Sequence, residues 1–501
     1  MNQKQYLLKG TFILTAAGLL SRIAGFFYKI FLSRTVGAEI MGIHQLILPV
    51  YAFCAAAAFG GIQTAVSKHV SADLAKGAKR EAWNSFLAGL FLSLLGALFC
   101  SLLLFSGSGW IASVFLGEPR CSPLLKILSV SLPFAAVHSC VSGYLVGQKK
   151  VLLPALSQLA EQVFRILFSF LLYFLFLEKG YSLSAAIIVL GQAAGEAASA
   201  ASCFLFLALS PRFSLPKKKE LRADIRATLS VSLPLSSSRM LLGVLQGIEA
   251  ALLPLQLRKF GLTASQALSE YGTFSGMALP LILFPTAITG SLGTLLLPAV
   301  SEAKSSSQNR QLHATIEASF LASLYLGFFC VNAFLLFGDE AGRLLFDSPA
   351  AGEYIVGLSF LCPFLYTNNT LSSILHGLGK TGAVSFLHSF SFVLRLLFVV
   401  LLVPAVGIEG YLYGVLLGQI FLSVSFLALL FKTTGYMPDP GRALLLPLSL
   451  CLSATGCMYL IRTLGLVPEN TWAGFFLEIF LYLAAFLLPG SRLFLLRNRS
   501  R

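Results

Sequence analysis

The chain has few charged residues for its length. Asp, Glu, Lys and Arg make up 11% of its 501 residues, whereas a soluble domain contains about 25%. Hydrophobic residues make up 56%, which excludes an ordinary soluble globular protein. Apolar runs long enough to cross about 30 Å of hydrocarbon recur along the whole sequence. We therefore predict an all-α polytopic membrane protein.

The connections between these runs are short, and several motifs of enzyme chemistry are missing. The longest expected outside loops, 107–122 and 339–352, are too short to hold a soluble domain. There is no P-loop for ATP, no G-x-S-x-G motif and no metal-spaced group of histidines. The nine cysteines form no C-x-x-C pair and no metal-ligand spacing. We expect no enzyme activity, no cofactor and no metal site.

The net charge of +15 suggests nucleic acid, but the placement of the cations argues against it. Most Lys and Arg fall in connections that we assign to the cytoplasm, among them 68–80, 149–150, 211–226 and 492–501. Membrane proteins favour positive charge in their cytoplasmic loops. This bias predicts that both termini are cytoplasmic, and it assigns the run 211–226 to anionic lipid headgroups rather than to nucleic acid.

Fourteen membrane spans fit the sequence. The first is retained rather than cleaved, because its apolar run exceeds about 20 residues and no A-x-A site lies near its end. The expected spans are 10–33, 40–67, 83–106, 123–147, 151–177, 182–210, 227–257, 271–301, 314–338, 353–376, 383–404, 410–431, 443–465 and 473–491.

An internal repeat relates the first six spans to the next six. It rests on five ordered matches: 21–22 with 238–239 at an offset of 217 residues, 65–86 with 299–320 at 234, 143–150 with 373–380 and 165–172 with 395–402 at 230, and 191–192 with 418–419 at 227. We predict two pseudo-symmetric six-helix lobes, 1–226 and 227–442, around a central cavity. Residues 443–501 add two further helices and a basic cytoplasmic tail. Transporters built from such repeats bind substrate between the lobes and rock about it.

Four arginines lie deep inside the predicted spans. A cation at such a depth costs about 2.5–3.5 kcal/mol on insertion scales, so each needs a reason. The repeat pairs Arg22 with Arg239 and Arg165 with Arg395. Guanidinium forks bind phosphate oxygens in pairs, so four of them around a cavity would suit a pyrophosphate. The alternative is neutralisation within one helix, which the i, i+4 spacing of Glu161 and Arg165 allows.

The remaining membrane charges receive other roles. Lys29 either extends to the interface or guards the cavity mouth, and Arg34 marks the outer boundary of the first span. Both are kept as candidates for substrate binding. The candidates for ion coupling are Glu161, Glu196 and Glu249. His138, His376 and His388 are either proton carriers or structural side chains.

Uncharged polar residues recur in the second, eighth and tenth spans. They either bind sugar hydroxyls in a wet cavity or form hydrogen bonds between helices, and the sequence leaves both open. This set is Gln45, Gln63, Thr286, Thr289, Asn368 and Asn369.

The stretch LLKGTFILTAAGLLSRIAGFFYKIFLSRTVGAE, residues 7–39, contains S-R-x-x-G-F and S-R-x-x-G-A. With the proline of the second span and the AVSK that closes it, this stretch resembles the multidrug/oligosaccharidyl-lipid/polysaccharide exporter superfamily. The branch is that of stage V sporulation protein B and the polysaccharide flippases of Gram-positive bacteria, which is similar to the lipid II flippases. The resemblance covers essentially the full chain.

The resemblance implies a bacterial plasma-membrane protein that flips an undecaprenyl-pyrophosphate-linked saccharide to the outer leaflet by alternating access. Its cargo would be lipid II or a polysaccharide repeat unit, and its partners would be membrane lipids and cell-wall synthesis enzymes. Arg22 and Arg34 match arginines of the lipid II flippases. The chain departs from them at Tyr28, where they have arginine, at Lys29, where they have aspartate, and at Ile43, where they have an acid.

Three other functions compete with the flippase. A drug or cation antiporter of the same fold would need an acidic, aromatic cavity, whereas the deep charges here are four cations and three acids. A membrane glycosyltransferase, ligase or polymerase would need a large outside loop or an acidic metal motif. A non-catalytic scaffold for cell-wall synthesis is compatible with the sequence.

Overall fold

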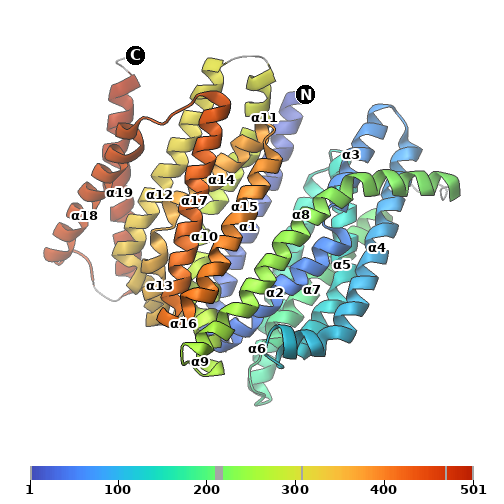
Figure 1. Cartoon of the computed structure of the whole chain (residues 1–501), viewed down its shortest axis with the longest axis horizontal. Helices are drawn as coiled ribbons and strands as arrows, with labels where there is room; N and C mark the ends of the chain where they lie inside the picture. Colours follow the sequence, from blue (N-terminus) through green and yellow to red (C-terminus); the bar gives the residue numbers. More distant parts are fainter. Residues whose placement is uncertain (1–2, 209–217, 306–308, 469–470, 499–501) are drawn as a thin grey trace. The chain divides into compact units, whose positions relative to one another are not determined.

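The computed structural model describes residues 3–208, 218–305, 309–468 and 471–498 (Figure 1). All regular secondary structure in these ranges is helical. The chain forms two compact units, Met1–Gly272 and Thr273–Arg501. The predicted basic run 211–226 lies partly outside the described residues, since its first seven residues are not described.

The first unit contains nine α-helices and one short π-helix in its described part. Helix α8 begins close to the predicted lobe boundary at residue 226, yet it packs against α2, α3 and α4 of this unit. The division of the sequence into lobes at 226 and 442 stays a prediction. The elements are α1(Gln3–Val36), α2(Ala38–Phe59), α3(Ile62–Ala75), α4(Lys79–Trp110), η1(Ile111–Phe115), α5(Cys121–Gly147), α6(Leu152–Glu178), α7(Ala186–Ala208), α8(Lys218–Lys259) and α9(Ala264–Gly272).

The second unit contains the remaining elements. They are η2(Thr273–Ala278), α10(Leu279–Leu283), α11(Thr286–Ser305), α12(Asn309–Phe346), α13(Pro349–Ser359), α14(Cys362–Gly377), α15(Thr381–Leu401), α16(Val403–Val406), α17(Ile408–Thr434), η3(Gly441–Leu445), α18(Leu446–Thr463) and α19(Trp472–Asn498).

The chain is a multi-pass membrane protein, but fourteen spans are not confirmed. The described residues contain eleven helices long and apolar enough to cross a membrane, and two bent helix pairs raise the number to 13. The segment Trp472–Leu487 of α19 is a shorter apolar helix. It overlaps the fourteenth expected span, so the difference in count concerns this last helix.

Prolines account for the two bent pairs. The axis turns by 52° between Leu283 and Thr286, where Pro285 lies in the break. It turns by 57° between α13 and α14, where Pro363 is the second residue of α14. Proline lacks the N–H that would continue the helical ladder, and its ring collides with the preceding turn. Each of the two breaks therefore has a proline in it or directly after it.

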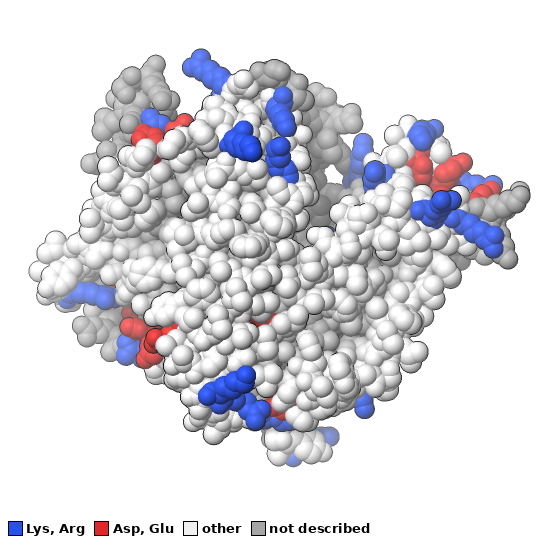
Figure 2. Space-filling view, in the orientation of Figure 1, with Lys and Arg blue, Asp and Glu red and all other residues white. Residues whose placement is uncertain are grey.

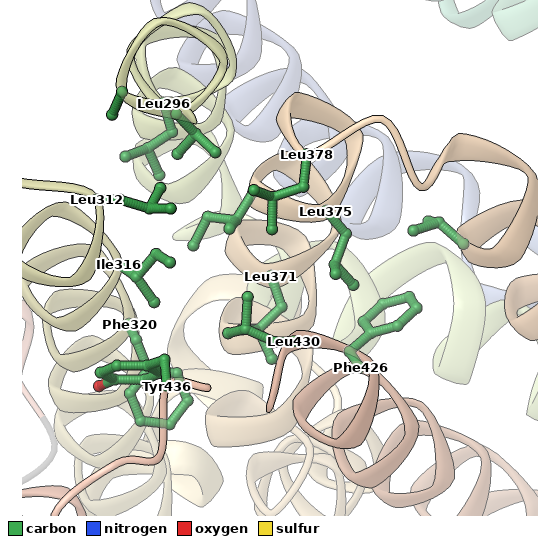
Figure 3. Packing of buried hydrophobic residues seen from close by; sticks show 14 of the residues in the cluster. Leu296, Leu312, Ile316, Phe320, Leu371, Leu375, Leu378, Phe426, Leu430 and Tyr436 are labelled. Atoms are coloured by element: carbon green, nitrogen blue, oxygen red, sulfur yellow. The ribbon is translucent and has the colours of Figure 1, made fainter. Parts of the chain in front are cut away.

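Aliphatic and aromatic side chains of five helices, α11, α12, α14, α15 and α17, form a buried core in the second unit (Figure 3). Leu296 of α11, Ile316 of α12, Leu371 of α14 and Phe426 of α17 all pack into one buried cluster. The corresponding cluster of the first unit joins α3, α4, α5 and α7, and includes Ala200 and Cys203 of α7. These cores are rigid because apolar interiors are close-packed.

The last two helices are attached to α12 by buried polar contacts (Figure 1). Asn332 of α12 donates to the Cys451 carbonyl at 3.2 Å and accepts from the Thr455 hydroxyl at 2.9 Å. The Tyr482 hydroxyl of α19 donates to the Phe329 carbonyl at 2.9 Å. These bonds are the kind that join helices inside a membrane, where backbone and amide groups have no water to bind.

On the face drawn in Figure 2, most charged side chains lie near the ends of helices. Figure 2 shows Lys and Arg gathered there and a broad uncharged surface between them. That surface includes a stripe on α4, where Phe91, Leu95, Leu98 and Leu102 are all more than half exposed. An apolar stripe of this length on an outer helix faces lipid. The charges inside the units therefore need partners or a wet cavity.

Candidate functional site

Two glycines bring α6 and α7 of the first unit into backbone contact. A Cβ on Gly195 would lie 2.7 Å from the Glu161 carbonyl oxygen, and a Cβ on Gly191 would collide with the Ser169 hydroxyl. The motif G-x-x-x-G allows helices to approach in this way because no side chain separates their backbones. The close approach brings Glu196, which follows Gly195, next to Glu161 of α6.

Three ionisable side chains from three helices meet beside this contact. A ring nitrogen of His138 (α5), a carboxylate oxygen of Glu161 (α6) and one of Glu196 (α7) all lie within 4.8 Å of one another. The closest atoms measured are His138 Nδ1 and Glu161 Oε2, 3.7 Å apart. Glu196 also accepts a hydrogen bond of 3.4 Å from the Tyr51 hydroxyl of α2. Four helices thus contribute to one polar centre.

Arg165 completes this centre. Its Nη2 donates to Oε1 of Glu161, one turn earlier on α6. The intrahelical pair that the i, i+4 spacing allows is therefore present. We call His138, Glu161, Arg165 and Glu196 the charged cluster.

The charge of the cluster can be counted. With a neutral imidazole and both carboxylates ionised, the cluster has a net charge of −1. One further positive charge neutralises the cluster, whereas a divalent metal ion would leave it at +1 inside the membrane. We therefore assign no metal ion to it. Burying a net charge is costly, so uptake of a single positive charge is favoured.

The cluster is partly accessible. Side-chain exposure is 16% for His138, 18% for Glu161 and 25% for Arg165, while Glu196 is buried. The core beneath holds it in place, because Ala200 and Cys203 follow Glu196 at positions i+4 and i+7 on the same face of α7.

Helix α1 is tied to the same part of α6. The Tyr28 hydroxyl and the Ser169 hydroxyl share a hydrogen bond of 2.7 Å, and the rings of Phe31 and Phe170 stack with centroids 3.9 Å apart. Ser169 lies one turn after Arg165. Tyr28 is where the chain departs from the lipid II flippases, and this tyrosine joins two helices instead of supplying a charge.

The other predicted arginines occupy different surroundings. Arg22 and Arg34 are exposed on α1. Arg239 of α8 donates to the Gly60 carbonyl, at the break between α2 and α3. Arg395 in the second unit lies over the Phe392 ring, 4.2 Å from its centroid. Convergence of the four arginines on one cleft stays a prediction.

The remaining candidates lie elsewhere in the first unit. Lys29 is half-buried on α1. Glu249 is buried on α8 and is not one of the three groups that meet beside Gly195. Of the three acids expected to couple ions, the structure therefore brings two together.

The repeat places neutral residues where the first unit has His138, Glu161 and Glu196, and it keeps the cation, because Arg165 corresponds to Arg395. At the offset of 230 residues His138 corresponds to Asn368 and Glu161 to Ser391, and at 227 Glu196 corresponds to Ser423. In the second unit the Ser423 hydroxyl donates to Asn368 Oδ1 at 2.7 Å, and the Ser391 hydroxyl donates to the Gly418 carbonyl at 2.9 Å. Helices of the same repeat therefore pack without these charges.

The uncharged polar residues of the second unit form hydrogen bonds between helices. Asn369 donates to Thr289 at 3.0 Å, and Asn368 donates to Gln419 Oε1 at 2.9 Å. This is the alternative to sugar binding that the sequence left open. His388 packs against the Phe426 ring, with centroids 5.3 Å apart, and His376 lies 3.2 Å from the Thr381 hydroxyl.

Sequence reasoning missed Tyr51, and it named His138 only together with His376 and His388, as a proton carrier or a structural side chain. No spacing links these residues to Glu196, because each lies on a different helix. Two signals were available. The G-x-x-x-G motif that ends one residue before Glu196 marks a close helix contact, and the repeat shows charge in one half where the other half is neutral.

The sequence matches a known family over residues 7–304, and the description of that family is polysaccharide biosynthesis protein. This segment is more than half of the chain. The chain belongs to the polysaccharide biosynthesis protein family. Arg22, Arg165, Arg239 and the whole charged cluster lie within the matched segment.

Individual proteins extend the similarity. Stage V sporulation protein B of Bacillus subtilis is 28% identical over 431 residues, which are 84% of this chain and 83% of that protein. Lipid II flippase MurJ of the same organism is 30% identical over 180 residues, 34% of this chain and 33% of that protein. A solved structure of lipid II flippase MurJ in an inward closed conformation matches with a TM-score of 0.75 at 14% identity, covering 98% of this chain and 100% of that one. At this identity the structural match establishes the fold alone.

Proposed function

We propose that the chain is a flippase that moves an undecaprenyl-pyrophosphate-linked saccharide from the inner to the outer leaflet by alternating access. The observation that carries this proposal is membership of the polysaccharide biosynthesis protein family across residues 7–304. The related lipid II flippase of Bacillus subtilis supports it, because that relative is named for moving a lipid-linked saccharide. The cargo is lipid II or a polysaccharide repeat unit.

The chemistry of the membrane arginines suits this cargo. A pyrophosphate cannot cross hydrocarbon unaided, and guanidinium groups bind its oxygens in pairs. Arg22 is the strongest candidate, because its side chain is exposed in the middle part of α1. Arg239 donates to the Gly60 carbonyl, which is a neutral partner, and Arg395 lies over the Phe392 ring; both are kept as candidates for the anion site. Arg34, Lys29 and Arg165 complete the proposed binding set.

The proposal also covers where the protein works. It is a transporter of the bacterial plasma membrane and not an enzyme, with both termini in the cytoplasm. Its partners are the lipid-linked saccharide, membrane lipids and cell-wall synthesis enzymes. Glu161, Glu196 and Glu249 are the proposed coupling residues.

A flipping assay tests the proposal directly. The purified full-length chain is reconstituted into vesicles that contain lipid II, or an undecaprenyl-pyrophosphate-linked saccharide of different sugar, in the inner leaflet. An impermeant reagent then measures arrival of each lipid in the outer leaflet, with protein-free vesicles as the control. Movement of at least one of the two lipids is expected. Failure to move either, or export of a cationic dye instead, would contradict the flippase.

A further inference from the structure

The charged cluster of the first unit contains more ionisable groups than packing requires. The repeat positions of His138, Glu161 and Glu196 in the second unit are Asn368, Ser391 and Ser423, of which all three take part in neutral hydrogen bonds, while Arg165 recurs as Arg395. Buried charges are expensive in a membrane and tend to mark ion or substrate pathways. A role beyond helix packing is therefore indicated for the charges of the first unit.

Glu161 has two competing partners in this cluster. Arg165 Nη2 contacts its Oε1, and His138 Nδ1 lies 3.7 Å from its Oε2. At 3.7 Å the imidazole makes no hydrogen bond. A protonated imidazole would close this gap and form a charge-assisted hydrogen bond to the carboxylate. Glu161 would then have a cation other than Arg165 to neutralise it.

We propose that His138 binds a proton and competes with Arg165 for Glu161, so that proton binding frees Arg165 for the pyrophosphate of the substrate. This inference rests on the proposed function. The proton comes from water and adds to Nδ1 of His138. The ion pair between Arg165 and Glu161 breaks, and the guanidinium donates to phosphate oxygens instead. Anion affinity therefore rises as the pH falls.

The groups that face His138 support the uptake of one proton. Glu161 and Arg165 come from α6, Glu196 from α7 and Tyr51 from α2. The cluster has a net charge of −1 before uptake and is neutral afterwards. Farther away, His44 of α2 interacts electrostatically with Arg165 and with Lys29 of α1. Tyr28 of α1 likewise interacts with Arg165.

The geometry also relates this exchange to the movement of a helix. The Tyr28 hydroxyl of α1 bonds to Ser169, one turn beyond Arg165 on α6. Helix α1 also carries Arg22 and Lys29, which belong to the proposed anion site. A change of partner at Arg165 therefore takes place one helical turn from the point where α6 holds α1.

Binding of undecaprenyl pyrophosphate to the purified full-length chain in nanodiscs tests the exchange. The dissociation constant is measured between about pH 5 and pH 8, where histidine titrates. In the wild type it should rise by up to about tenfold per pH unit, the limit for one linked proton. Glu161→Gln releases Arg165 permanently and should bind tightly throughout. His138→Asn should bind weakly throughout, as the wild type does at high pH.

Two controls isolate the cluster. The phosphates of the ligand also change protonation with pH. The ratio of the wild-type dissociation constant to that of Glu161→Gln, followed against pH, is therefore the quantity that reports on His138. Glu178→Gln removes an exposed carboxylate at the end of the same helix and should follow the wild type. Glu161→Ser copies the residue found at the repeat position and serves as the second variant for folding.

Several outcomes would overturn the inference. They are Glu161→Gln binding more weakly than the wild type at every pH, His138→Asn keeping the wild-type pH dependence, or affinity that follows sodium concentration at constant pH. A separate measurement distinguishes this inference from the proposed function. Nitrogen NMR of histidine-labelled protein without ligand should show His138 titrating, and Glu161→Gln should shift that titration. If this result holds but no undecaprenyl pyrophosphate binds, the flippase proposal fails and the proton site remains.

Discussion

His138 Nδ1 lies 3.7 Å from Glu161 Oε2, although the two residues come from different helices of the first unit. The other oxygen of the same carboxylate belongs to Arg165. The Glu161 carboxylate therefore lies between Arg165, which is always charged, and His138, which is charged only when it is protonated. This arrangement is the geometric basis of the proposed proton exchange.

Arg22 is expected to be needed for transport and not for folding. Its side chain is exposed on α1, so Arg22→Ala removes an anion contact without opening a core. A lost hydrogen bond to a charged group costs about 1.5–3 kcal/mol, which predicts lipid affinity about tenfold to a hundredfold weaker. Vesicle flipping and lipid binding measure the effect. Arg22→Lys keeps the charge without the planar fork and should recover part of the activity; normal flipping by Arg22→Ala would remove Arg22 from the site.

Arg239 should behave differently from Arg22, because its side chain also contacts the backbone at the break between α2 and α3. Its guanidinium donates to the Gly60 carbonyl between α2 and α3. Arg239→Ala should reduce both transport and stability, the latter by about 1–3 kcal/mol for an unsatisfied buried acceptor. Thermal unfolding in detergent and flipping in vesicles separate the two effects. An unchanged melting temperature together with normal flipping would contradict both roles.

Gly195 should tolerate no larger residue. A Cβ there lies 2.7 Å from the Glu161 carbonyl oxygen, so Gly195→Ala forces α6 and α7 apart and displaces Glu196. Overpacking of this kind costs about 1–3 kcal/mol. Gly109→Ala is the matched control, because nothing lies within 4 Å of its new Cβ. The melting temperature of the purified protein should fall for Gly195→Ala and stay constant for Gly109→Ala; equal values would show that the helices do not touch here.

The charged cluster can be replaced by the set that the second unit uses at the same repeat positions. The combined variant is His138→Asn, Glu161→Ser, Gln162→Phe and Glu196→Ser, where the phenylalanine copies Phe392 beneath Arg395. Arg165 remains in this variant, and the new phenylalanine gives it a ring partner in place of Glu161. We expect a folded protein whose melting temperature no longer depends on the protonation of residue 138. Failure to fold would indicate that the charges are structural.

Asn332 is expected to hold the last two helices against α12. It bonds to the Cys451 carbonyl and to the Thr455 hydroxyl of α18. Asn332→Ala leaves both groups without this partner and should cost about 1–3 kcal/mol. Limited proteolysis between α18 and α19 should then become faster. The neighbouring α12 substitution Leu335→Ala, at an exposed side chain, should leave the rate unchanged, and equal rates for the two variants would mean that α18 docks without Asn332.

Much of the fold followed from local signals. Apolar runs interrupted by short basic connections predicted a helical membrane protein, and thirteen of the expected spans have counterparts in the described helices. The bends at Pro285 and Pro363 are local effects too, because proline acts on its own turn. The fourteenth expected span is not confirmed, because the described apolar part of α19 is shorter than the helices counted as membrane spans.

Less of the site could be predicted. The pair between Glu161 and Arg165 could be predicted from the sequence, because residues spaced i, i+4 lie on the same face of a helix. The meeting of His138 with Glu196 was not, since nothing in the spacing of residues on α5 and α7 states how the helices are turned. The second-unit pair of Asn369 with Thr289 was left open for the same reason.

The sequence by itself determined which residues are charged inside the membrane, and it determined that Arg22 and Arg165 recur in the second half as Arg239 and Arg395. Composition and periodicity describe single segments of the chain. They therefore decide which segments can span a membrane and which segments recur in the second half. Only the tertiary structure decided that Gly191 and Gly195 bring α6 and α7 together, and that a histidine and two glutamates then share one centre. The physical reason is that helix rotation and close backbone approach depend on side-chain packing between segments far apart in the chain.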